Sequence, residues 1–554
     1  MNRRSKALRP LRVAAHFTRE QLWHHLRGRA LRPLSPLLAA LERSPRTPDP
    51  WGALFAGISP PETPGVELDG LRQRRFEFDG TTVVVGPDDD WSQVEATMLT
   101  RFQLHYFDWL WDLARLEASD AQTVFEDLWW SWRRGTSRGR GVAWEPYVTA
   151  CRAWNLCVVV PRIAADSDCF RDVAGLMHYH LSQLVRLLER DVGGNHLIKD
   201  LKGLLALALV LGDSGAAERW ATELTSTAAS QLLADGGHVE RAPYYHLQVL
   251  GDLLDAATVM RASGLSDLAA ELNATCERMR LWAEALADST GSVPNFGDSP
   301  RRAPRVLLDR EANPIESRLL EASGFAVLAS PDNFEVSVNL GSIAGTRVLP
   351  GHSHADSLSF QMLVSGELVV CDAGCSTYAP GPVRSYERST VAHSTIAIDG
   401  EDQSEIFGAF RVGHLARTEL IAFLPSASGG SLTAAHDGFR HLPGAPRHER
   451  TLSLSNGCLE VIDNITGAGQ HRIAQSVPLA PGFEPVATSA GMFDIGSGLA
   501  IVFLATPGED LEQTVRIERA WASTGHGSRE TSARLERRLD LYLPARLAFQ
   551  LCRI

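Results

Sequence analysis

The spacing of apolar residues changes near residue 320, and this change limits the folds open to the 554-residue chain. Before it, apolar residues recur every three or four positions, as on the buried face of a helix, and Asn195–Gly212 is a clear example. After it, Phe334–Leu340 alternates apolar and polar residues, which indicates a half-buried strand. A helical part is therefore followed by a β-rich part.

The number and spacing of these segments predict the architecture. Helical patterns with short connections extend from about Trp91 to Leu320, which favours a toroid or solenoid of helical hairpins. Short strands separated by turn signals then predict an antiparallel β-sandwich. Arg-rich helices and a short hairpin turning at Asp79-Gly80 precede both. We expect an α+β multidomain chain with domains at residues 1–90, 91–320 and 321–554.

Charge is unevenly distributed along the chain. The net charge is −12, but residues 1–46 carry eleven Arg or Lys and only two Glu, so the remainder carries −21. An acidic body argues against nucleic-acid binding. The basic stretch could contact anionic lipid or a partner, although a solvated helical arm is the preferred interpretation. No apolar run is long enough to form an integral membrane segment.

Two further features bear on the compartment. The eight cysteines are scattered without the spacing of a disulfide framework or a cysteine zinc site. The basic N-terminus is not followed by the apolar stretch of a secretory signal, so we expect a cytoplasmic location.

Three clusters in the β-rich part could carry chemistry. In a strand, His352, His354 and Asp356 would share one face, but about 7 Å apart, too far for all three to bind one ion without a bend. His354 could instead join Asp372 and His393, which border other predicted strands. Two imidazoles and a carboxylate suit zinc with an open fourth position. The alternative is that they are unrelated polar residues at strand ends.

The helical part offers Asn195 and His196 at a helix start, and Tyr244, Tyr245 and His246 at another. Each also has a structural interpretation, since Asn195 suits a helix N-cap, the histidines can be ordinary hydrogen-bonded groups and the tyrosines can belong to the core. Eight of the thirteen Trp, Trp109 among them, lie between residues 91 and 154. They could stack on sugar rings or simply pack helices together.

Several ordered motifs resemble the heparinase II/III-like polysaccharide lyases, and also certain alginate lyases. The resemblance covers roughly residues 95–415 and implies an (α/α) toroid joined to an antiparallel β-sandwich. The motifs that carry it are FQLHYFDWL (102–110), GGNHLIKDLKGLLALAL (193–209), DGGHVERAPYYHLQVL (235–250), HSHADSLSF (352–360), VVCDAGCSTY (369–378) and RSYERSTVAHSTIAIDG (384–400).

The resemblance also implies roles for individual residues. Asn195 matches the residue that neutralises the uronate carboxylate, with His196 beside it in the site. Tyr245 and His352 match the two acid/base residues. His354, Asp372 and His393 match the metal ligands, usually of zinc, which we expect in preference to calcium. Ser394 departs from the family, which often has Asn there. Expected substrate contacts are Arg241, Lys199, His246 and Trp109.

The implied reaction is β-elimination on a uronic-acid-containing glycan, in which the C5 proton is removed and the C4–O bond breaks. A tyrosine base needs nearby positive charge, for which Arg241, Lys199 and Lys202 are candidates. The expected partner is an acidic polysaccharide or oligosaccharide. The resemblance leaves a periplasmic location and a homo-oligomer open. Two alternatives remain: a zinc-dependent glycan hydrolase, and a non-catalytic protein of capsule or exopolysaccharide assembly.

Overall fold

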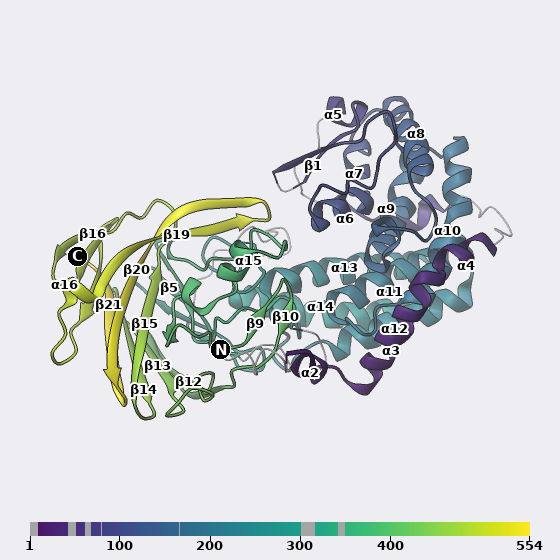
Figure 1. Cartoon of the computed structure of the whole chain (residues 1–554). Coiled ribbons are helices and arrows are strands. Elements are labelled where there is room, and N and C mark those ends of the chain that lie inside the picture. Colours follow the sequence, from purple (N-terminus) through teal and green to yellow (C-terminus); the bar gives the residue numbers. More distant parts are fainter. Residues whose placement is uncertain are drawn as a thin grey trace. The chain divides into compact units, whose positions relative to one another are not determined.

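The computed structural model describes residues 9–41, 51–60, 68–78, 80–165, 167–300, 316–341 and 350–554 (Figure 1). The chain divides into two compact units that are not consecutive in sequence. The helical unit comprises Phe17–Leu232 and Gln248–Arg278. The sheet unit comprises Met1–His16, Leu233–Leu247 and Met279–Ile554, so a short segment from the middle of the helical sequence belongs with the sheets.

The helical unit confirms the predicted helical spacing. Its most buried helices are α9 and α11, and Gly203 of α11 allows their close approach, because a Cβ there would lie 3.1 Å from the Cα of Ala150. Gly212 follows α11 with φ of +71°, the left-handed conformation that glycine commonly adopts just after a helix. The elements are α3 (Arg19–Leu31), η1 (Arg32–Leu34), α4 (Ser35–Leu41), η2 (Gly52–Phe55), α5 (Leu68–Arg72), β1 (Arg75–Phe78), β2 (Thr81–Val84), α6 (Met98–Tyr106), α7 (Leu110–Leu113), α8 (Ala118–Gly135), η3 (Val142–Trp144), α9 (Pro146–Ile163), α10 (Asp168–Leu187), α11 (Gly194–Val210), α12 (Ser214–Ser230) and most of α13 (Pro243–Ala262) and α14 (Ser266–Leu286).

The predicted hairpin before the helices is confirmed, since β1 and β2 pair antiparallel with Phe78 opposite Thr81. Asp79, in its expected turn, lies outside the described residues. Among the described residues, no helix is both long and apolar enough to cross a membrane.

The sheet unit is antiparallel at every described pairing, as the period-two pattern predicts. Strands β13 and β14 alternate buried and less buried residues, but β5 is buried throughout, including Glu335, which accepts a hydrogen bond from the Ser289 N–H at 2.9 Å. The three larger sheets run β3-β4-β5-β6-β7, β11-β12-β13-β14-β21-β18-β17-β16 and β19-β20-β15-β8, and β9 pairs with β10.

Bounds of the elements in the sheet unit are as follows: α2 (Arg9–Ala14), β3 (Arg318–Leu320), β4 (Phe325–Ser330), β5 (Phe334–Asn339), β6 (Phe360–Val364), β7 (Glu367–Val370), α15 (Pro382–Glu387), η5 (Thr390–Ala392), β8 (Ile396–Ile398), β9 (Ile406–Phe407), β10 (Arg411–Val412), β11 (Thr418–Ser426), β12 (Gly429–His436), β13 (Arg447–Ser455), β14 (Cys458–Thr466), β15 (Gln470–Pro478), β16 (Val486–Ser489), β17 (Met492–Gly496), β18 (Leu499–Leu504), α16 (Leu511–Thr514), β19 (Val515–Gly525), β20 (Ser528–Tyr542) and β21 (Ala545–Arg553).

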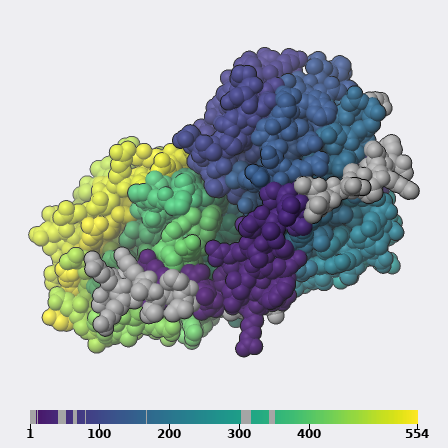
Figure 2. All heavy atoms as spheres, turned by 45° about the vertical axis from the view of Figure 1, so that its right-hand side comes forward, coloured from purple at the N-terminus to yellow at the C-terminus, as the bar shows by residue number. Residues whose placement is uncertain are grey.

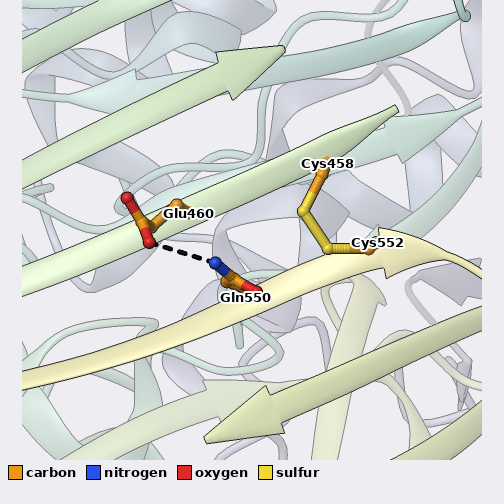
Figure 3. The surroundings of a disulfide bond; sticks show 4 residues. All are labelled: Cys458, Glu460, Gln550 and Cys552. Atoms are coloured by element: carbon orange, nitrogen blue, oxygen red, sulfur yellow. Dashed lines mark hydrogen bonds between the residues drawn. A yellow bond between two sulfur atoms is a disulfide. The ribbon is translucent and has the colours of Figure 1, made fainter. Parts of the chain in front are cut away.

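A disulfide joins β14 to β21, which the spacing of the cysteines does not indicate. Cys458 and Cys552 are 94 residues apart in sequence but face each other in the register of these strands (Figure 3). On the same two strands, the Gln550 side chain donates a hydrogen bond to Glu460 at 3.1 Å. The remaining six cysteines are free and buried.

Candidate active site

The candidate site in the sheet unit is assembled from separate segments. Tyr245 lies at the start of α13, whereas His352 and His354 lie in an irregular segment, residues 350–359, before β6. Residues 350–359 therefore do not form the strand in which His352, His354 and Asp356 would share one face. Because the backbone bends here, the two imidazoles can reach the same buried group.

Tyr245 and His352 form a stacked pair. Their ring centroids are 3.8 Å apart and the ring planes differ by 21°. The Tyr245 hydroxyl also hydrogen-bonds to the Tyr378 hydroxyl, which belongs to one of the motifs that carry the resemblance. The backbone N–H of Tyr244 instead donates a hydrogen bond to Ser299 Oγ at 3.1 Å. Of the two tyrosines, Tyr245 is therefore the one that pairs with the predicted catalytic imidazole.

Asp298 is the group that both histidines reach, and the sequence reasoning missed it. Its Oδ2 lies 3.0 Å from His352 Nδ1, and its Oδ1 lies 2.9 Å from His354 Nε2. Arg384 donates to both carboxylate oxygens, at 2.8 Å for the Nη2 contact with Oδ2. Asp298 and Arg384 are both fully buried. One carboxylate thus fixes a predicted catalytic histidine and a predicted metal ligand together.

The sequence carries one signal for Asp298, the glycine before it. Gly297 has φ of +62°, and a Cβ there would lie 2.6 Å from the carbonyl oxygen of His352. The Asp298 N–H also donates to that carbonyl at 3.0 Å. Only glycine permits this approach between the backbones of residues 297–298 and 352.

Electrostatics set the protonation of this group. Burial acts to raise the pKa of Asp298, but Arg384 and the two imidazoles outweigh it and hold that pKa well below its ordinary value. Burial raises the pKa of Tyr245 well above its ordinary value, and the charge on Asp298 raises it further. At neutral pH, Asp298 is therefore a carboxylate and Tyr245 a neutral phenol.

The expected cation beside Tyr245, Arg241, is directed elsewhere. Its Nε donates to the carbonyl of Ser323 at 2.6 Å, and its guanidinium lies 5.8 Å from the ring centroid of Phe325. Burial lowers its pKa to about 10. It still lines a small cavity with His352 and Asp356, so its predicted contact with substrate stays a prediction. Arg384 is instead the buried cation near the hydrogen-bonded Tyr245 and Tyr378, and its guanidinium lies 5.2 Å from the ring centroid of Tyr378.

The structure brings His354, Asp372 and His393 together as predicted. All three are buried, and their candidate ligand atoms lie within 4.8 Å of one another. His393 Nδ1 lies 2.7 Å from Asp372 Oδ2, whose other oxygen accepts from the Gly374 N–H at 2.9 Å. His354 Nδ1 and His393 Nε2 are buried without a hydrogen-bond partner.

These residues fit a zinc ion chemically. Buried polar atoms in proteins are almost always hydrogen-bonded, so two unpartnered imidazole nitrogens beside one carboxylate form a donor set that suits a zinc ion. The other ring nitrogen of His354 contacts Asp298, which is the usual support for a metal-binding imidazole.

A second buried network holds the segments that follow the two histidines. Arg450 donates to the carbonyl of Leu358 at 2.8 Å and to that of Ser394. Ser394, where the family often has Asn, donates from its hydroxyl to the Phe360 carbonyl at 2.5 Å and accepts from the Phe360 N–H at 2.7 Å. The Ser394 hydroxyl thus links the same two segments that Arg450 links.

His246 is not a substrate-binding residue. It is buried, its Nδ1 accepts from the His238 N–H at 3.2 Å and its Nε2 lies 2.9 Å from the carbonyl of Met279. Burial lowers its pKa to about 3. Both ring nitrogens therefore serve the backbone, and the ordinary structural interpretation is correct.

The remaining predicted residues belong to the helical unit. Asn195 is buried in the first turn of α11, but it is not the N-cap, which is Gly193. His196 Nδ1 lies 3.1 Å from Glu189 Oε2. Lys199 pairs with Asp252 at 2.6 Å, and although burial acts to lower the pKa of Lys199, the Asp252 charge raises it.

Trp109 does not offer a sugar platform. Only 2% of it is exposed, and its ring packs against Phe76 and Phe107 at centroid distances of 5.8 and 4.8 Å. The prediction from tryptophan enrichment is wrong at this position because the rings fill the core of the helical unit.

Comparison with solved structures places this architecture among the heparinase-type proteins, which combine a helical part with antiparallel sheets. A crystal structure titled Heparinase III has a TM-score of 0.73 at 15% identity, over 95% of this chain and 88% of that one. A mutant of the heparan sulfate lyase HepC from Pedobacter heparinus has a TM-score of 0.60 at 16% identity, over 95% and 88%. At such identities the likeness establishes the fold alone.

Sequence comparison then defines the family. Residues 140–314 match the model of the heparinase II/III N-terminus, and residues 312–547 match that of the heparinase II/III-like C-terminal domain. The chain belongs to the heparinase II/III-like family, which confirms the resemblance.

Two curated relatives match parts of the chain. FtsZ-localized protein C of Caulobacter vibrioides is 23% identical over 397 residues, covering 68% of this chain and 66% of that protein. A heparin-sulfate lyase of Bacteroides thetaiotaomicron is 22% identical over 284 residues, covering 42% and 40%. The chain thus matches less than two thirds of the length of each.

Proposed function

We propose that the chain is a polysaccharide lyase that cleaves uronic-acid-containing glycans by β-elimination. The observation that carries the proposal is the stacked pair of Tyr245 and His352, held by the buried carboxylate of Asp298. The family match supports the same reaction, and relatives named heparin-sulfate lyases make heparin and heparan sulfate the first substrates to test.

The proton positions suggest which residue is acid and which is base. When His352 donates from Nδ1 to Asp298, the basic lone pair of the neutral imidazole lies on Nε2. Tyr245, a neutral phenol in the resting protein, holds a proton that it can donate. In the proposed reaction, His352 removes the C5 proton and Tyr245 protonates the oxygen that leaves C4.

Charge develops on the uronate carboxylate as the C5 proton departs, and it needs hydrogen-bond donors. The family resemblance assigns one of these donor roles to Asn195, with His196 beside it. Both are residues of the helical unit at the start of α11. Arg241, which lines the small cavity with His352, would add a cation near the substrate.

His354, Asp372 and His393 would hold a zinc ion, which when bound would fix the two imidazoles and the segments that carry them. Because Asp298 contacts both His354 and His352, this order extends to the catalytic imidazole. No chemical step of the proposal passes through the ion.

A screen of heparin, heparan sulfate, chondroitin sulfate, hyaluronan and alginate tests the proposal. We expect the purified chain to generate the ultraviolet absorbance of a 4,5-unsaturated uronate with at least one of them. New reducing ends without this absorbance would show a hydrolase instead. Binding without any product would favour a non-catalytic role.

A further inference from the structure

The N-terminal part of the helical unit exposes an unusual number of large apolar side chains. Of twenty such residues among the described ones, five lie within sixteen consecutive positions of α3, η1 and α4. We call them the N-terminal patch; they are Leu22 (45% exposed), Trp23 (59%), Leu26 (58%), Leu34 (47%) and Leu37 (61%). Figure 2 shows this N-terminal segment, in purple, on the surface.

The patch belongs to an ordered element whose other face is anchored. A capping box formed by Thr18 and Gln21 starts α3. Gln21 donates to the carbonyl of Asp191 at 3.3 Å, and His25 Nδ1 lies 2.9 Å from the carboxylate of the same residue. Arg32 pairs with Glu145 at 3.3 Å, which fixes the junction to η1. The exposed face therefore belongs to an ordered, anchored part of the helical unit.

Most residues of the patch lie along a narrow line. Trp23, Leu26, Leu34 and Leu37 follow helical spacing once the exposed Ala30 is included, although the line continues from one helix into the next. A stable interface between two protein copies buries about 800 Å² from each. A single line of side chains suits shallow insertion between lipid headgroups better than such a broad contact.

The charges around the patch identify the surface it fits. Arg19, Arg29 and Arg32 are exposed beside it, the Arg27 guanidinium lies 5.9 Å from the ring of Trp23, and Glu20 is the one acidic residue between positions 17 and 41. Arginines flanking exposed Trp and Leu are typical of segments that lie in the interface of an anionic bilayer.

We propose that α3, η1 and α4 form a surface that binds the chain peripherally to anionic lipid membranes. Leu and Trp side chains of the N-terminal patch enter the headgroup region, and the arginines contact the negatively charged lipids. This inference is independent of the proposed lyase activity, and neither depends on the outcome of the other.

Co-sedimentation of the full chain with vesicles tests the proposal. We expect binding to vesicles of phosphatidylcholine mixed with phosphatidylglycerol, weak binding to phosphatidylcholine alone, and loss of binding at high salt. The Trp23→Ser/Leu26→Ser variant should partition at least about tenfold less, from lost apolar burial. Arg29→Gln should partition about fivefold less.

The matched control is Ile421→Ser/Leu424→Ser, which removes two apolar side chains of similar exposure (47% and 64%) from β11 of the sheet unit. We expect it to bind vesicles as the unaltered chain does. Because all four positions are exposed, unchanged circular dichroism and melting temperature should confirm folding of both variants.

Three results would overturn the proposal: no binding of the unaltered chain to anionic vesicles, equal binding to both kinds of vesicle, or equal losses in the patch variant and the β11 control. Light scattering tests the alternative that the N-terminal patch contacts a second copy of the chain. If the patch variant converts an oligomer to a monomer while vesicle binding is unchanged, the patch is a contact between copies. Turnover of a polysaccharide, measured without vesicles, reports separately on the lyase proposal.

Discussion

Two buried aspartates of the sheet unit have nearly the same neighbours and differ in where their networks end. Asp298 contacts Arg384 and two histidines. Asp463 contacts Arg450 at 2.7 and 2.9 Å and His448 at 2.7 Å, and a second histidine follows, because His436 Nε2 lies 3.0 Å from His448 Nδ1. In both cases burial acts to raise the pKa of the aspartate and the arginine lowers it below its ordinary value.

The Asp463 network closes at its histidines, whose ring nitrogens all have hydrogen-bond partners. The ring nitrogen of His436 that does not face His448 accepts from the Gly438 N–H at 3.1 Å, and Gln475 donates to Asp463 at 2.6 Å. The Asp298 network instead ends at the stacked Tyr245 and at the unpartnered Nδ1 of His354. Buried charge with a depressed pKa is therefore no sign of a functional site here; an imidazole nitrogen without a partner is what distinguishes the Asp298 network.

The largest expected effect comes from changing Tyr245, at the open end of the Asp298 network. Tyr245→Phe removes the hydroxyl proposed to protonate the leaving oxygen, so kcat/KM should fall about 10²- to 10⁴-fold. Tyr244→Phe is the matched control and should retain activity. Initial rates of unsaturated-uronate formation measure both, and near-normal turnover by Tyr245→Phe removes the assignment of that residue.

Replacing each aspartate by asparagine compares the networks directly. Either change leaves a buried arginine without its carboxylate, which typically costs about 3–5 kcal/mol of unfolding free energy. Asp298→Asn should also lower kcat/KM about 10- to 100-fold, because it releases the support of His352 and His354. Asp463→Asn should affect activity far less.

Denaturant unfolding and initial rates at a low temperature, where both variants remain folded, distinguish these effects. Equal activity losses in the two variants would contradict the division into an open and a closed network. If Asp463→Asn does not fold, Gln475→Leu weakens the same network more gently, since Gln475 makes one hydrogen bond to Asp463.

Metal content tests whether the unpartnered nitrogens of His354 and His393 bind an ion. Protein purified with zinc present should contain about one ion per chain, and His354→Ala should lose it, because three protein ligands are the usual minimum for such a site. His448→Ala, in the closed network, should keep the ion while losing stability. Elemental analysis and melting temperatures with and without chelator measure both properties. Equal zinc in the His354 variant would exclude this histidine as a ligand.

The smallest effect is a pH dependence of stability at Asp463. Since its folded pKa lies below the unfolded value of about 3.9, its contribution is complete above about pH 5 and is lost as the pH falls further. The melting-temperature difference between the unaltered chain and Asp463→Asn should therefore shrink in acid. Asp332→Asn, at an exposed position, is the control. A melting-temperature difference for Asp463→Asn that grows in acid would contradict the prediction.

Local patterns predicted the fold and the convergence of three candidate metal ligands. The change of period locates the helices and strands, and His354, Asp372 and His393 were recognisable because each lies in a motif at the edge of a strand. Residues of this kind are marked by their immediate neighbours in sequence. Their convergence follows from how an antiparallel β-rich unit orders its strands.

Contacts between distant segments could not be predicted. Asp298 is 54 residues from His352 and 86 from Arg384, and only the glycine before it hints at a close approach. Arg241 was a candidate cation near Tyr245, but its φ of +55° is not helical and its Nε donates to the carbonyl of Ser323. Aromatic enrichment did not distinguish the core residue Trp109 from a surface platform.

Segment Leu233–Leu247, which carries Tyr245, belongs to the sheet unit although helical sequence flanks it on both sides. A truncation that begins at residue 312, where the second family match starts, would keep every sheet of the sheet unit and all three candidate zinc ligands but lack the phenol. Such a fragment would keep these candidate ligands without the proposed acid. Exchanging C-terminal halves between relatives would likewise recombine an imidazole from one parent with a tyrosine from the other, so chimeras should be joined so that both segments come from the same protein.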